Sequence, residues 1–246
     1  MENSPRHHEW DDVKTDSGRT VRCFVAFPEV KGPATTLVVI HENRGLDDWA
    51  RSFADQVAEA GYLAIAPDLL SGTAPGGGGT AEYGSTDAAR QGIYKLPTEQ
   101  VREDLAAVFA FAKRQSAGNG KVAVAGFCWG GGQSFAHAGA SPHVAAACVF
   151  YGTAPGDDAT YEAIRAPVYG FYGGDDHRIT GAVPAVAKKM EQLDKPYSPV
   201  IYEGAGHAFM RRGETEPAGS ANHQAREQAW AKLKQLLKSL DGDQQP

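Results

Sequence analysis

Lys121-Val-Ala-Val-Ala-Gly-Phe-Cys-Trp-Gly-Gly-Gly132 is the stretch of sequence that decides the fold. Its first half is a short apolar run with small residues between larger ones, which is typical of a buried parallel strand. Gly126-Phe-Cys-Trp-Gly130 ends this run, and residues 133–138 are suitable for a helix. The order of strand, turn and helix places Cys128 on a sharp bend, where a Cβ on a flanking glycine would collide with neighbouring backbone.

The pattern Gly-x-Cys-x-Gly leaves two interpretations for Cys128. In the first, it is the nucleophile elbow of an α/β-hydrolase, with cysteine where serine usually stands. The N–H groups at the start of the following helix then favour a thiolate and stabilise an oxyanion on the substrate. In the second, Cys128 is a small buried residue in a glycine-rich turn. The remaining sequence distinguishes the two.

The composition excludes several classes of function. The net charge of −6 argues against nucleic acid or an anionic membrane surface as the main partner. No apolar run reaches membrane-spanning length, and the polar start of the chain does not resemble a signal peptide. Cys23, Cys128 and Cys148 are scattered, which favours free thiols in a reducing compartment and a cytoplasmic protein.

Strands and helices are expected to alternate along the whole chain. Strands are expected at residues 20–27, 35–41, 62–68, 121–127, 143–151, 166–172 and 198–202. Helices are expected at residues 47–61, 88–96, 98–114, 182–193 and 221–240. The alternation predicts one doubly wound, mostly parallel α/β domain over residues 1–246, with helices flanking the sheet. A glycine-rich, lid-like flexible segment is expected near residues 71–97.

A cysteine nucleophile needs a base that accepts its proton and a third group that orients the base. In α/β-hydrolases these groups follow in the order nucleophile, acid, histidine. Cys128 follows one predicted strand and His207 follows the last one. Between them, Asp175 and Asp176 follow another strand. Because the carboxyl ends of parallel strands meet at one edge, we expect a Cys-His-Asp triad there, with either aspartate as the acid.

The other histidines in this half of the chain do not fit the role of base. His177 adjoins the acid, His137 lies within a predicted helix, His143 precedes a strand and His223 begins the last helix. No group of histidine, cysteine and acidic residues has the spacing of a zinc site, so no metal is expected.

Two further positions remain open from the residues alone. Glu42 follows the strand at residues 35–41 and is either a solvated loop acid or a site residue. The N–H of Asn43 stands where these hydrolases place an oxyanion donor, whereas His41 is expected to pack at the strand end. Arg90 and Tyr94 share a helix face, which by itself is an ordinary solvated face.

Four motifs together resemble the dienelactone hydrolase (carboxymethylenebutenolidase) family of the α/β-hydrolase superfamily. They are Gly-Phe-Cys-Trp-Gly-Gly, Gly-Gly-Asp-Asp-His, Ala-Gly-His-Ala-Phe and, upstream, His-Glu-Asn-Arg-Gly. The resemblance covers about residues 20–240 and implies an α/β-hydrolase fold. It implies Cys128 as nucleophile, His207 as base and Asp176 as acid, since the family's acid immediately precedes the histidine of this turn.

The resemblance also implies roles around the triad. Glu42 matches a carboxylate that holds the resting thiol and takes its proton when substrate arrives. The N–H groups of Asn43 and Trp129 match the oxyanion hole. The residues that match the family's carboxylate-binding side chains are Arg90, Tyr94 and Arg211.

The expected reaction is hydrolysis of a lactone or small activated ester through a thioester, without a cofactor. The expected partner is that small-molecule substrate, anionic if the arginines bind it, and the protein is expected to be a monomer or weak homodimer. The alternatives are a promiscuous esterase or organophosphate hydrolase, and a catalytically silent ligand-binding or redox-sensing protein. The sequence departs from the family at residues 43–44, at Pro97 and at Gly76 to Gly79, which leaves the substrate open.

Overall fold

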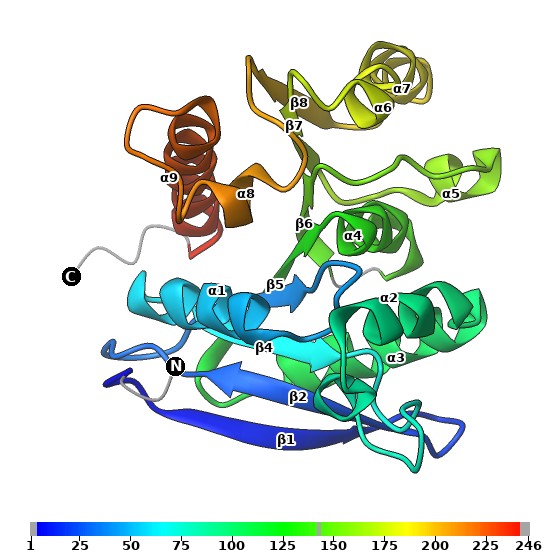
Figure 1. Ribbon diagram of the computed structural model, residues 1–246, viewed down its shortest axis with the longest axis vertical. Helices are drawn as coiled ribbons and strands as arrows, with labels where there is room; N and C mark the ends of the chain where they lie inside the picture. The colour runs from blue at the N-terminus through cyan, green and yellow to red at the C-terminus, as the bar shows by residue number, and fades with distance from the viewer. Residues whose placement is uncertain (1–3, 142–143, 242–246) are drawn as a thin grey trace. The chain divides into compact units, whose positions relative to one another are not determined.

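The computed structural model describes residues 4–141 and 144–241, and the chain divides into two compact units between Val124 and Ala125. Strands alternate with helices in both units (Figure 1). Strand β5 (Gly118–Phe127) begins in the first unit and ends in the second. The single domain expected for residues 1–246 stays a prediction.

The strands of the first unit lie in the order β1-β2-β4-β3-β5. Their bounds are β1 (His8–Lys14), β2 (Thr20–Ala26), β3 (Ala34–Ile40) and β4 (Leu63–Asp68). The pairs β1–β2 and β2–β4 are antiparallel, and the pair β3–β4 is parallel. Every residue of β3 and β4 is buried, which explains their continuous apolar sequence.

Strand β1 is not predicted by the sequence pattern. Its residues His-Glu-Trp-Asp-Asp-Val-Lys include only one fully buried side chain, Val13. An edge strand with two polar faces lacks the alternation of apolar residues that reveals a half-buried strand. Here the pairing with β2 determines the strand.

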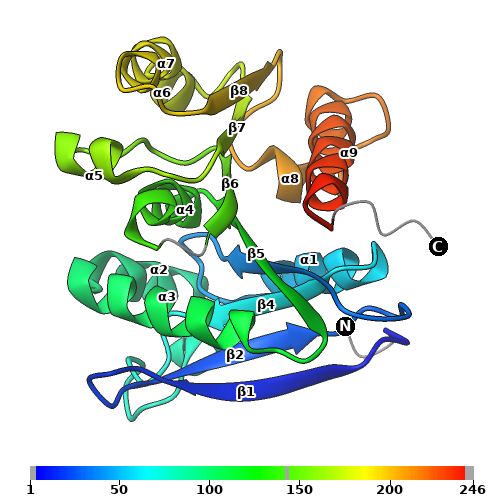
Figure 2. The same ribbon diagram turned by 180° about the vertical axis from the view of Figure 1, so that it is seen from behind.

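The helices of the first unit are α1 (Asp48–Glu59), a single 3₁₀ turn η1 (Thr80–Tyr83), α2 (Thr86–Lys95) and α3 (Thr98–Lys113). Asp47 caps α1 by accepting a hydrogen bond from the N–H of Ala50 at 3.1 Å. Helix α1 lies in front of the strands of this unit in Figure 1, whereas α3 comes forward in the reverse view of Figure 2. The strands of this unit therefore carry helices on both faces.

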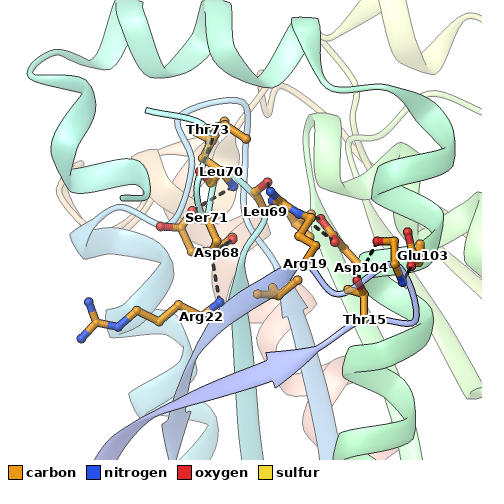
Figure 3. A network of polar contacts seen from close by, with 12 residues as sticks. Thr15, Arg19, Arg22, Asp68, Leu69, Leu70, Ser71, Thr73, Glu103 and Asp104 are labelled. Atoms are coloured by element: carbon orange, nitrogen blue, oxygen red, sulfur yellow. Dashed lines mark hydrogen bonds and ion pairs between the residues drawn. The ribbon is translucent and has the colours of Figure 1, made fainter. Parts of the chain in front are cut away.

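A buried ion pair joins Arg19, the residue before β2, to Asp104 of α3, as Figure 3 shows. The Arg19 Nε donates to both carboxylate oxygens of Asp104 at 3.0 and 3.1 Å, and Nη2 donates to the carbonyl of Leu69 at 3.2 Å. The Asp104 side chain is fully buried, and this burial raises its pKa although Arg19 opposes the shift.

The strands of the second unit are β6 (Val144–Phe150), β7 (Val168–Gly173) and β8 (Tyr197–Tyr202), neighbours in that order and parallel. Its helices are α4 (Trp129–Ala140), α5 (Asp158–Ala163), α6 (His177–Thr180), α7 (Val183–Gln192), α8 (Phe209–Arg212) and α9 (Ala221–Asp241). Helix α8 lies beside α9 in both views (Figures 1 and 2).

Helix α4 starts at Trp129, before the predicted start at residue 133. Three consecutive glycines have low helix propensity, which hides this first turn from sequence analysis. They are needed because the backbone approaches closely: a Cβ on Gly131 would lie 2.7 Å from the carbonyl oxygen of Phe150. The short helices α5, α6 and α8 are also not predicted, since none has enough residues to show a helical period.

The predicted doubly wound, mostly parallel α/β fold is confirmed. Among residues 4–141 and 144–241, no helix is both long enough and apolar enough to cross a membrane.

Candidate active site

Cys128 lies on the strained turn that the sequence predicts between β5 and α4. Its φ of 55° falls in the left-handed region, and its N–H donates to the carbonyl of Phe150 at 3.0 Å. An added Cβ on Gly126 would lie 1.9 Å from the carbonyl oxygen of Gly130, so the predicted steric need for glycine is confirmed there. Trp129 begins α4, whose N-terminus therefore starts at the nucleophile position.

The other two cysteines are unsuited to nucleophilic chemistry. Cys23 and Cys148 are fully buried, while Cys128 is partly exposed. Burial raises the pKa of the Cys148 thiol to about 12 and that of Cys23 further. Since the thiolate is the reactive form, only Cys128 of the three is placed to supply one.

Two strand-end loops of the second unit are joined by backbone hydrogen bonds. After β7, the N–H of Gly174 donates to the carbonyl of Tyr202 at 2.8 Å, and that of Asp175 to the carbonyl of Ala205 at 2.9 Å. The Asp175 side chain is exposed, whereas Asp176 is buried. The joined loops bring Asp176 to the loop that carries His207.

His207 pairs with the buried acid of the expected triad, and Cys128 acts on the same ring. Its Nδ1 lies 2.5 Å from Oδ2 of Asp176, and Cys128 is among the groups that raise its pKa. Burial lowers the pKa of His207, but the hydrogen bonds and charges of Cys128 and Asp176 outweigh burial and raise it to about 9. An imidazole between a thiol and a carboxylate is the arrangement of a general base with its orienting acid.

The loop that carries His207 is held from α9. The N–H of Gly206 donates to Oδ1 of Asn222 at 2.8 Å, and Nδ2 of Asn222 donates to Glu216 at 2.8 Å. Asn222 is buried although it stands in the first turn of a surface helix. Sequence analysis misses this residue because an asparagine near a helix start usually has only a local capping role.

Several predicted site residues lie in the first unit. Glu42 is 4% exposed and directly follows the buried strand β3 and His41. The Asn43 side-chain amide donates to the Tyr94 hydroxyl at 3.0 Å, and Tyr94 is 64% exposed. Arg90, whose side chain is 43% exposed, forms an ion pair with Asp87 at 2.9 Å. Arg211, in the second unit, is half-buried in α8.

Other histidines considered in the sequence have different surroundings. His41 is fully buried, with its Nδ1 2.7 Å from the Glu42 carbonyl, and its Nε2 accepts the N–H of Leu69 at 3.3 Å. His223 Nδ1 lies 3.0 Å from the carbonyl of Gly213, and His177 is exposed. His143 lies outside the described residues.

A cavity of about 820 Å³ opens in the first unit, and none of the predicted site residues of that unit lines it. Trp10, Leu46 and Thr80 are among its lining residues, and the Arg22 guanidinium lies 4.5 Å from the centre of the Trp10 ring. None of the described groups proposed for acid, base or nucleophile chemistry lines it.

Comparison with known proteins shows which family the chain belongs to. The model of the dienelactone hydrolase family matches residues 21–240. The chain belongs to the dienelactone hydrolase family. A carboxymethylenebutenolidase of Pseudomonas putida is 30% identical over 218 residues, which cover 85% of this chain and 89% of that protein.

Solved structures show the same fold. A Klebsiella pneumoniae protein described as a dienelactone hydrolase gives a TM-score of 0.81 at 25% identity, over 95% of this chain and 98% of that one. A dienelactone hydrolase-like promiscuous phosphotriesterase from metagenomic libraries gives 0.77 at 23% identity, over 96% and 99%, which shows the fold alone. As a dienelactone hydrolase family member, the protein is an α/β-hydrolase-fold enzyme that hydrolyses esters or lactones, and the family resemblance is confirmed.

Proposed function

We propose that the protein hydrolyses a lactone or small activated ester by covalent catalysis from Cys128. The observation that carries this proposal is the hydrogen bond of His207 to the buried Asp176, on a ring whose pKa is also raised by Cys128. The position of Cys128 at the start of α4 supports it, because N–H groups at a helix N-terminus stabilise an oxyanion that forms on the substrate.

In the proposed reaction, Glu42 accepts the thiol proton and the Cys128 thiolate attacks the substrate carbonyl carbon, with the His207 ring protonated because its pKa is raised to about 9. The tetrahedral oxyanion is stabilised by backbone N–H groups, that of Trp129 at the start of α4 and, by the family resemblance, that of Asn43. Collapse forms a thioester and releases the alcohol oxygen, which takes a proton from His207. His207 then removes a proton from water, and hydroxide attack on the thioester releases the acid and Cys128.

Glu42 is assigned a role in the resting enzyme. The family resemblance makes it the carboxylate that holds the thiol and accepts its proton when substrate arrives. Its burial at 4% exposure, directly after the buried strand β3, supports a specific role, because a solvated loop acid would be exposed.

Two candidate substrates, an anionic lactone and a neutral ester, differ in charge. The resemblance assigns Arg90, Tyr94 and Arg211 to a substrate carboxylate, which favours an anionic lactone. A neutral ester is favoured by the surroundings of two of them: Arg90 is already paired with Asp87, and the Tyr94 hydroxyl accepts from Asn43. We place the anionic lactone first and the general esterase second. The three free cysteines favour action in a reducing compartment such as the cytoplasm.

Turnover of p-nitrophenyl acetate, with mass spectrometry of the quenched enzyme, tests the proposal. The wild-type protein should turn over and carry an acetyl group on Cys128 during turnover. Cys128→Ala should lose at least about 10³-fold in kcat, and Cys148→Ala is the matched control that should keep it. Full activity of Cys128→Ala, or acetylation elsewhere only, would end the proposal. Absence of turnover in the wild type on a panel of esters and lactones would favour a silent binding protein.

A further inference from the structure

Strained backbone conformations occur at Cys128, directly after His207 and at the end of β6. In the described part of the chain, the non-glycine residues with positive φ are Cys128, Tyr151, Asp194 and Ala208. Cys128 is the nucleophile, Ala208 follows His207, and Tyr151 follows β6. A positive φ is a genuine outlier for a bulky side chain and persists only where surrounding contacts enforce it. Tyr151, with a φ of 41°, is the largest of these residues.

Backbone hydrogen bonds connect the region around Tyr151 to Cys128 and to the strand that leads to Asp176. Its N–H donates to the carbonyl of Phe171 at 2.8 Å, in the strand β7 that leads to Asp176. The preceding carbonyl, that of Phe150, accepts the N–H of Cys128 at 3.0 Å. The following residue packs on the start of α4: a Cβ on Gly152 would lie 2.3 Å from a backbone atom of Gly131.

The ring of Tyr151 contacts His207, the third member of the expected triad. The ring is fully buried, and its centre lies 5.1 Å from that of the His207 imidazole, at an interplanar angle of 64°. It also meets Phe209, two residues after His207, at 5.2 Å and 74°. Both are edge-to-face arrangements, which are the favoured geometry for aromatic pairs.

We propose that Tyr151 is a positioning residue whose ring fixes the plane of the His207 imidazole, so that it bonds to Asp176 and Cys128 at the same time. The inference rests on the proposed function. An imidazole must lie in one plane to place both nitrogens correctly, and a rigid ring against it restricts rotation about the Cβ–Cγ bond. Since the contact uses the ring, phenylalanine should replace tyrosine, whereas a flexible side chain should not.

The test compares Tyr151→Leu and Tyr151→Phe with a control, Phe135→Leu. Phe135 is equally buried in the same unit, and its ring meets Tyr161 and Tyr197 rather than His207. Tyr151→Leu should lower kcat by about 10-fold to 100-fold with little change in KM, as small misplacements of catalytic groups do. Tyr151→Phe and Phe135→Leu should stay within about threefold of the wild type. Tyr151→Met, which keeps more of the volume, replaces Tyr151→Leu if that variant does not fold.

A spectroscopic measurement separates positioning from simple loss of stability. The Nδ1–H proton between His207 and Asp176 gives a downfield proton NMR resonance, which should persist in Tyr151→Phe and Phe135→Leu and broaden or vanish in Tyr151→Leu. An unchanged resonance and full kcat in a folded Tyr151→Leu or Tyr151→Met would overturn the proposal, as would an equal loss in Tyr151→Phe. If the wild type shows no turnover, the proposed function fails, while the resonance still reports on Tyr151.

Discussion

The sharpest prediction concerns the two adjacent aspartates after β7. Asp176→Asn should lower kcat far more than Asp175→Asn, although both changes remove one negative charge from the same turn. The Asp176 carboxylate is buried and lies 2.5 Å from Nδ1 of His207, whereas Asp175 is exposed. The pair is therefore its own control for net charge and for the local backbone.

The magnitude follows from the hydrogen bond that is lost. The Asp176 carboxylate accepts the Nδ1 proton of His207, which leaves Nε2 to donate a proton to the leaving alcohol and to accept one from water. An asparagine amide can instead donate to Nδ1, which moves the ring proton to Nε2 and blocks the base. A hydrogen bond to a charged group contributes about 1.5–3 kcal/mol. Together with the wrong tautomer, we expect a loss of about 4 kcal/mol, or roughly 10³-fold in kcat.

Steady-state kinetics on folded variants measure this, with the ring pKa of His207 followed by NMR. Asp176→Asn should lower that pKa from about 9 toward the ordinary value of 6.5, because one of the causes that raise it is removed. Asp175→Asn should stay within about twofold in kcat, as surface substitutions usually do. Equal losses in the two variants, or a larger loss in Asp175→Asn, would refute the assignment of the acid.

Other predictions test the substrate, the pH dependence and the stability. Arg90→Ala and Arg211→Ala should raise KM for a carboxylate-bearing lactone by about 10-fold and barely change it for a neutral ester; small, identical effects on both would leave a general esterase. The pKa of His207 is raised to about 9, so its protonated form contributes stability that is complete below 6.5 and is lost as the pH rises through 9. The urea midpoint should accordingly fall more between pH 6.5 and 9.5 in the wild type than in His207→Gln, and parallel curves would contradict this. Arg19→Met leaves the buried Asp104 carboxylate unpaired and should cost about 3–5 kcal/mol by urea denaturation. The double variant with Asp104→Leu should recover most of that loss, and no recovery would show that the pair is not coupled.

Much of the fold is determined by local sequence. The strands β3 and β4 are continuous apolar runs, and α1 and α3 have a clear helical period with recognisable ends. Side-chain burial and helix capping determine such elements, and both can be recognised from residues close together in the sequence. Elements without such local patterns, such as β1 and the glycine-rich start of α4, form because of what they pack against.

The sequence also predicts the groups of the candidate site in outline. Cys128 between glycines, followed by an acid pair and a late histidine at strand ends, gives the order of groups that an α/β-hydrolase requires. Strand ends lie at one edge of a parallel sheet, so position in the chain predicts proximity.

Only the tertiary structure decides how these groups are held. It buries Asp176 and exposes Asp175, through hydrogen bonds between loops that are about thirty residues apart in sequence. It sets Asn222 behind the His207 loop and the Tyr151 ring against the imidazole. Contacts of this kind depend on which distant segments of the chain the fold brings together. No local pattern encodes them, because the same residues in another loop would be ordinary capping or core side chains.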